Sequence, residues 1–293
     1  MRYDAFSKHH PAVNFLFFLG AAGSAMLIQH PWYLLAGLLG SGIYYLLLHG
    51  GKGWRVILGM VPLFLLLAAM NPLFNRSGER VLFWYFGRPY TLEALLYGGA
   101  IAAVFVEMIL WFGCCGAVLT SDKFTSLFGN LIPALSLLLV MVLRMIPNLL
   151  RKAKQLTGAR SSIGHGVSER DSLGQKLAEG LTVLGALTGW ALEGSVVTAD
   201  SMRSRGYGSG RHTSFQRYTM TRSDWALLLV QLLLLLAALL YGDRTAVYTP
   251  ELSIAPVGGS AGAGLAAYTA YLLIPTALHI KEAIQWHISI SRI

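Results

Sequence analysis

The sequence predicts an all-α integral membrane protein, with about six transmembrane helices and two long cytoplasmic helices inserted between the N-terminal and C-terminal spans. Of its 293 residues, 55% are hydrophobic and only 13% are charged, which is too few charges for a water-soluble surface. The apolar residues gather in segments near the roughly 20 residues that cross a bilayer. We therefore divide the chain into N-terminal spans (1–119), a cytoplasmic helical region (120–222) and C-terminal spans (223–293).

Each expected span is an apolar segment bounded by turn-forming or charged residues. The six segments are 14–28, 32–48, 54–70, 92–119, 225–241 and 261–280. The turn after the second segment carries Lys52 and Arg55, and positive charge favours the cytoplasmic side of a membrane. We therefore expect both termini to be cytoplasmic, in a multi-pass protein of the inner (cytoplasmic) membrane.

Two loops should lie on the outer side. One follows Asn71 and Pro72, where the third span is expected to have ended. Its aromatic stretch 81–86 predicts either a short hairpin or an interfacial helix. The other, 242–260, is rich in Gly, Pro and Ser.

Glu107 lies among apolar residues in the fourth expected span. A carboxylate inside a membrane is costly, so such a residue is a candidate for an ion pathway. The other interpretation, which we favour, is that Glu107 faces the protein interior and bonds a neighbouring helix.

In a soluble protein, a net charge of +9 would suggest that the protein binds nucleic acid. In a membrane protein it is better explained by the excess of Lys and Arg in cytoplasmic segments, so no nucleic-acid partner is expected.

Two long helices are expected within the basic region. The first begins with the apolar segment 127–143, passes Arg144 and Pro147, and ends at Arg160. Pro133 and Pro147 would kink it or mark segment boundaries. The second is capped by Ser172 and runs to about Arg205. Its apolar positions predict one continuous buried stripe, in the order Leu173, Leu177, Leu181, Leu184, Thr188, Ala191, Ser195, Thr198 and Met202. Its spacing of small residues at Gly185 and Gly189 would let another helix approach closely.

Both expected helices end in arginines among small residues. An arginine in the last turn followed by glycine is ordinary helix termination. Two such ends in one membrane protein also suit docking, because a guanidinium binds carboxylates through two parallel hydrogen bonds. The two ends read Ala159-Arg160-Ser161 and Met202-Arg203-Ser204-Arg205-Gly206-Tyr207.

These stretches resemble the transmembrane T component of energy-coupling factor transporters, the scaffold of an ABC-type importer. That family has a short Ala-Arg-Gly motif at the end of each of two coupling helices. Here the first motif reads Ala159-Arg160-Ser161 and the second Ser204-Arg205-Gly206. The turn formed by Arg144 and Pro147 adds to the likeness, which covers the central third of the chain.

The resemblance implies a non-catalytic subunit that binds no cofactor of its own. Two cytoplasmic ABC ATPase subunits would bind ATP and hold the arginines in acidic grooves, with Arg144, Pro147, Met202, Arg203 and Tyr207 supporting the coupling helices. A separate small membrane subunit would bind the substrate, a vitamin or a transition-metal ion. The Gly185 and Gly189 seam would be the place where the helices cross or where that subunit packs. No Walker-type phosphate-binding motif occurs in the sequence.

Two other function classes stay open. An independent ABC-type permease or other polytopic transporter would form its own pathway. A membrane-bound enzyme would need a cluster of catalytic residues, and the eight histidines are scattered, including His9, His10, His165, His212, His279 and His287. Their spacing supports no metal site, and we expect His9 and His10 to be interfacial.

Overall fold

The computed structural model describes residues 4–75, 78, 80–85, 88–129, 133–164, 172–209, 218–241, 246–248, 253–254 and 259–290. The chain divides into two compact units. The bundle unit comprises Met1–Thr120 and Tyr218–Ile293, and the inserted unit comprises Ser121–Arg217. The predicted connector 161–171 lies outside the described residues from 165 onward, as does the basic stretch 210–217.

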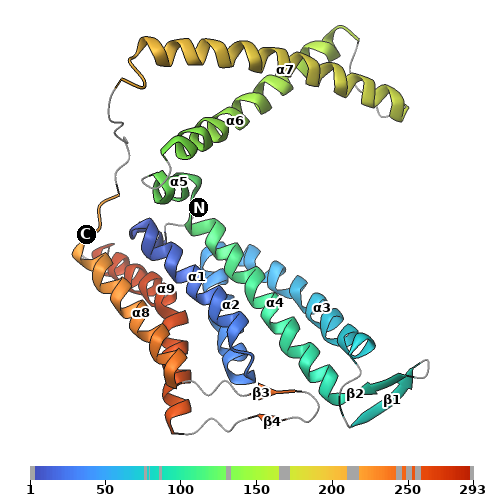
Figure 1. Ribbon diagram of the computed structural model, residues 1–293, viewed down its shortest axis with the longest axis vertical. Helices are drawn as coiled ribbons and strands as arrows, with labels where there is room; N and C mark the ends of the chain where they lie inside the picture. The colour runs from blue at the N-terminus through green and yellow to red at the C-terminus, as the bar shows by residue number, and fades with distance from the viewer. Residues whose placement is uncertain are drawn as a thin grey trace. The chain divides into compact units, whose positions relative to one another are not determined.

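The bundle unit consists of packed helices (Figure 1). They are η1 (Phe6–Lys8), α1 (Pro11–Leu27), α2 (Pro31–His49), α3 (Gly51–Phe74), α4 (Leu92–Val118), α8 (Arg222–Tyr241) and α9 (Ser260–Ile290). Helix α4 packs against α1, α2 and α3, while α9 packs against α2 and α8. Two of these helices begin with proline, whose fixed φ and missing N–H suit the first turn.

The centre of the bundle is aromatic. The Phe17 ring lies 5.5 Å from Trp111 of α4 and 5.0 Å from Tyr271 of α9, measured between ring centroids. Phe6 of η1 is fully buried and packs edge-on against Phe17 at 5.3 Å. Large rings that meet edge-to-face or at a tilt therefore hold the helices together.

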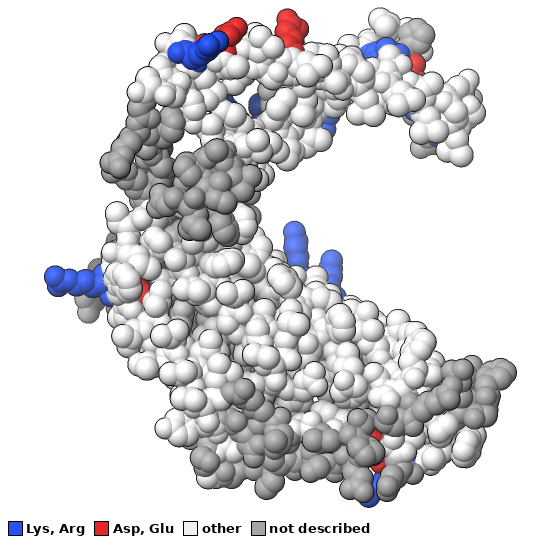
Figure 2. All heavy atoms as spheres, viewed as in Figure 1, with Lys and Arg blue, Asp and Glu red and all other residues white. Residues whose placement is uncertain are grey.

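The outside of the bundle is apolar. Figure 2 shows a face with few charged side chains, and those that are visible on the bundle lie towards helix ends. Within the described residues, six helices are long and apolar enough to cross a membrane: α2, α3, α4, α7 (Leu173–Ser204), α8 and the greater part of α9. The chain is therefore a multi-pass α-helical membrane protein, as its composition predicts.

The membership of this set differs from the sequence-based set of six. Helix α1, expected as the first span, is apolar but has only 17 residues, so it does not belong to the set of six. Helix α7, expected to be cytoplasmic, has the length and hydropathy of a span.

Two hairpins occur between bundle helices. Strands β1 (Val81–Tyr85) and β2 (Arg88–Thr91) pair antiparallel, so the described part of the aromatic stretch is one strand of a hairpin rather than an interfacial helix. Strands β3 (Ala246–Val247) and β4 (Ser253–Ile254) form a second short pair in the loop before α9.

Two bundle helices are longer than the sequence suggested. Helix α9 continues past the expected end at 280 to Ile290. Helix α3 was expected to end before Asn71 but continues through Pro72 to Phe74. A proline inside a helix leaves the carbonyl four residues earlier without its usual donor, here that of Ala68. Gly98 of α4 lies against that carbonyl, so the interruption falls where α3 and α4 approach closely.

The inserted unit contains α5 (Ser121–Gly129), α6 (Pro133–Ser162) and α7. The stretch from 127 to Arg160 is divided between two helices, because α5 ends at Gly129 and α6 begins at Pro133. Pro133 is thus a boundary, as the sequence allowed, whereas Pro147 lies inside α6. The start of α7 is as predicted: Ser172 forms a reciprocal capping box with Gln175.

Candidate functional site

The end of α7 is a glycine-terminated helix end that exposes arginines. The Gly206 N–H donates to the Arg203 carbonyl and the Tyr207 N–H to the Met202 carbonyl, both at 3.0 Å. Gly206 has a φ of 76°, which glycine adopts without a steric penalty. These two hydrogen bonds end the helix and turn the chain away from it. The side chains of Arg203 and Arg205 are exposed. Ser204 is exposed beside them.

The end of α6 is different, because its arginine is already paired. The Arg160 guanidinium contacts the Glu179 carboxylate of α7, with Nε at 2.9 Å and Nη2 at 2.7 Å from the same oxygen. Both side chains are about a quarter exposed, so solvent screens the pair only in part. Ala159 and Ser161 are exposed on either side. Of the two predicted docking arginines, Arg205 is thus presented to solvent and Arg160 is bound within the unit.

The two long helices of the inserted unit also meet at a second polar contact. The Lys152 ammonium of α6 lies 5.6 Å from the centre of the Trp190 ring of α7, a cation–π arrangement. Figure 1 shows α6 and α7 crossing. Arg144 and Pro147, predicted to support the coupling helices, are exposed on α6.

An apolar groove of about 550 Å³ lies between α6 and α7. Its lining residues are Met145, Leu149, Leu150, Ala153, Leu184, Leu187, Thr188, Ala191, Leu192 and Ser195. The groove contains three positions of the predicted stripe, Leu184, Thr188 and Ala191.

The prediction of a buried stripe on α7 is wrong for the chain alone. Within the described chain α7 contains no buried residue, and Leu173, Leu177 and Leu181 are each more than half exposed. A Cβ added at Gly185 or Gly189 would meet nothing within 4 Å. The periodicity predicted the apolar face correctly, but α6, which forms the groove with Leu184, Thr188 and Ala191, covers this face only in part.

Glu107 lies in the interior of the bundle. Its side chain is fully buried, accepts a hydrogen bond from the Trp111 indole at 3.3 Å, and interacts with Tyr268 of α9. The carboxyl group rests directly on Gly37 of α2, where any Cβ would collide with both oxygens. The favoured interpretation, an interior residue joined to neighbouring helices, is confirmed. One oxygen, Oε2, is buried without a hydrogen-bond partner among the described residues.

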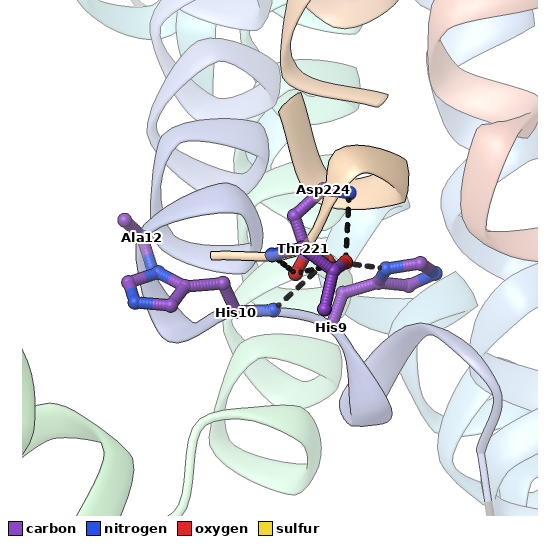
Figure 3. A network of polar contacts seen from close by, with 5 residues as sticks. All are labelled: His9, His10, Ala12, Thr221 and Asp224. Atoms are coloured by element: carbon purple, nitrogen blue, oxygen red, sulfur yellow. Dashed lines mark hydrogen bonds and ion pairs between the residues drawn. The ribbon is translucent and has the colours of Figure 1, made fainter. Parts of the chain in front are cut away.

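His9 and His10, which the sequence analysis expects to be interfacial, both bond the start of α8 (Figure 3). The His9 ring lies 2.7 Å from the Asp224 carboxylate, and the His10 N–H donates to the same oxygen at 3.3 Å. Asp224 also forms a reciprocal cap with Thr221. The spacing of Thr221 and Asp224 before an apolar run was a readable signal for this cap. The partnership with His9 had no local signal.

Among the described residues, no group of three or more His, Cys, Asp or Glu side chains is arranged to hold a metal ion. No family model matches the chain, and no curated protein matches it.

Proposed function

We propose that the chain is the transmembrane scaffold and coupling subunit of an energy-coupling factor importer for vitamins or transition-metal ions. The proposal rests on the length, the exposure and the arginine-bearing end of α7. This helix has 32 residues, presents exposed arginines at its end, and buries no residue within the described part of its own chain. An apolar helix face needs a covering surface, and exposed arginines suit a partner's carboxylates.

The proposal assigns each surface a partner. Two cytoplasmic ABC ATPase subunits dock at the helix ends that carry Arg160 and Arg205. A small membrane subunit, which binds the substrate, packs on the apolar face of α6 and α7. The chain itself is non-catalytic and binds no ATP. Its termini and its inserted unit lie on the cytoplasmic side of the inner membrane.

In this mechanism the chain converts the movement of the ATPases into movement in the membrane. The ATPases close on ATP and separate after hydrolysis, and α6 and α7 follow because their arginine ends are held in acidic grooves. The contacts of Arg160 with Glu179 and of Lys152 with Trp190 join the two helices, so that they move together. The movement tilts the substrate-binding subunit.

The Arg160–Glu179 pair adds a condition to docking. A partner carboxylate that binds Arg160 must replace Glu179 or share the guanidinium with it. Sharing is possible because Glu179 contacts only Nε and Nη2 of Arg160, which leaves the N–H groups of Nη1 and one N–H of Nη2 available.

One observation favours a second candidate, an independent polytopic transporter. Helix α7 has the length and hydropathy of a membrane span. Against this, Glu193 is exposed near the middle of the apolar part of α7. A lipid-facing carboxylate at the membrane centre costs about 2.5–3.5 kcal/mol on insertion scales, so we place α7 outside the hydrocarbon.

The test is affinity purification of the tagged chain from its native membrane in mild detergent, followed by mass spectrometry. Two ABC ATPase chains and a small hydrophobic protein are expected to co-purify. Recovery of the chain alone, or as a homodimer, would favour the independent transporter.

The docking residues are tested by the double variant Arg160→Gln and Arg205→Gln. Glutamine is used because a glutamate at 160 would face Glu179. We expect at least a tenfold loss of ATPase association, since charge-paired contacts at interfaces are worth about 2–5 kcal/mol. The matched control is Arg151→Gln with Lys154→Gln, which removes two exposed charges from α6. Equal association of the double variant and the control would refute the docking model.

A further inference from the structure

The segment 4–10, which contains η1, is bonded to several bundle helices at once. Asp4 is buried, and its Oδ2 accepts hydrogen bonds from the Tyr44 hydroxyl of α2 at 2.7 Å and from the Ser7 N–H at 3.2 Å. Its Oδ1 lies 3.1 Å from Nδ1 of His279 on α9. Lys8 forms an ion pair with Glu282, also on α9. A buried carboxylate with partners on every side fixes the segment in one position.

The same segment bonds the start of α8. Asp224, in the first turn of α8, contacts both the His9 ring and the His10 N–H (Figure 3). The Asp224 carboxylate is only 5% exposed, so solvent weakens this contact little. Asp224 also accepts hydrogen bonds from the Thr221 N–H at 3.0 Å and the Thr221 hydroxyl at 2.8 Å. One carboxylate therefore joins the helix cap to the N-terminal segment.

The segment also reaches the end of α4. The Ser7 hydroxyl donates to the carbonyl of Val118, the last residue of α4, at 3.4 Å. Phe6 lies in the same buried cluster as Val118 and Cys114. The segment is thus hydrogen-bonded to the end of α4 and belongs to the same apolar cluster.

These two helix ends are the places where the chain leaves and re-enters the bundle unit. The inserted unit begins at Ser121, just after α4, and ends at Arg217, just before the cap of α8. We propose that residues 4–10 form a clamp that holds these two junctions together. Asp4 and His9 are its positioning residues, with Asp224 as the receiving group on α8.

The clamp gives the bundle a fixed base for the inserted unit. Without it, a force on α6 or α7 would displace the end of α4 and the start of α8 independently. With it, both junctions move as one body. This consequence rests on the proposed function, in which such a force comes from ATPase subunits.

The clamp itself is tested by hydrogen–deuterium exchange on the full chain in lipid nanodiscs. In His9→Ala we expect exchange to rise about tenfold in peptides covering 218–226 and also in those covering 115–121, from the loss of a charge-assisted contact. His49→Ala is the matched control, because His49 is an exposed histidine stacked on Tyr45 of α2. A rise confined to 218–226, or no rise, would overturn the clamp.

A second variant separates the clamp from the helix cap. Asp224→Asn keeps an oxygen for Thr221 while weakening the contact with His9. If the clamp acts through this contact, His9→Ala changes exchange at 115–121 no further in the Asp224→Asn background. Additive effects would mean that His9 acts elsewhere and would overturn the assignment.

The coupling role is tested on the complex with its co-purified ATPases, using Mg²⁺-ATP as the probe. We expect His9→Ala to retain ATP hydrolysis but to lose the ATP-dependent change in exchange of the bundle peptides. Retention of that change would overturn the coupling role. If no ATPase co-purifies with the wild-type chain, the proposed function fails, while the nanodisc experiment still decides whether the clamp exists.

Discussion

Replacing Gly37 by alanine should destabilise the bundle, and Glu107 is the reason. A Cβ at this position would overlap both carboxylate oxygens of Glu107. The carboxyl cannot move away cheaply, because it is fully buried and holds the Trp111 indole. Overpacking of this kind costs about 1–3 kcal/mol. That cost corresponds to a fall in melting temperature of roughly 2–5 °C for a chain of this size, at about 2.1 cal/mol/K of unfolding entropy per residue.

The assay is thermal unfolding of the purified chain in detergent, followed by intrinsic fluorescence. The matched control is Gly42→Ala on the same helix, where a Cβ meets nothing within 4 Å. That control should be neutral or slightly stabilising, because alanine restricts the unfolded chain more than glycine. Shortening the carboxylate side chain with Glu107→Asp should recover part of the loss in Gly37→Ala. An unchanged melting temperature in Gly37→Ala, or strict additivity with Glu107→Asp, would refute the reasoning.

The other stability predictions use glycines in the same way. Gly98→Ala should lower the melting temperature, since its Cβ would lie 2.6 Å from the Ala68 carbonyl oxygen of α3, and backbone cannot rotate away. Gly99→Ala, with nothing within 4 Å, is its control, and equal effects of the two would contradict a close approach of α3 and α4. Gly206→Ala should cost about 1 kcal/mol because φ is 76°, and should raise hydrogen exchange about fivefold in peptides covering 203–208. Unchanged exchange there would show that the end of α7 does not depend on the glycine turn.

Most of the fold could be predicted from local sequence. Long apolar segments predicted the bundle helices to within a few residues at most ends, and the Ser172 cap predicted the start of α7. The errors fell where tertiary contacts outweigh local signals. A proline normally terminates a helix, yet α3 continues past Pro72 to Phe74, at a place where Gly98 lets α4 approach closely. The charges at the end of the last expected span likewise did not stop α9.

The candidate site was less predictable, because its important contacts join distant positions. Asp4 pairs with His279 and His9 with Asp224, and no local pattern links residues so far apart in the chain. Such pairs are set by which helices pack together, and a single sequence does not specify this. The arginines at the ends of α6 and α7 belong to local sequence patterns, and they were predicted. That Arg160 is paired with Glu179 depends on the crossing of α6 and α7 and was not foreseen.

The apolar stripe of α7 was predicted to be buried, but the structure leaves it exposed. Periodic apolar residues are normally buried by their own chain, and here they are not. The same helix carries open positions at Gly185 and Gly189, whereas Gly37 and Gly98 of the bundle lie under tight contacts. Gly37 and Gly98 mark places where helices of the chain already pack closely. Gly185 and Gly189 lie on a helix whose apolar residues are not buried by the described part of the chain. In the proposed function, the substrate-binding membrane subunit would cover these residues, because an apolar helix face is stable only when another apolar surface packs on it.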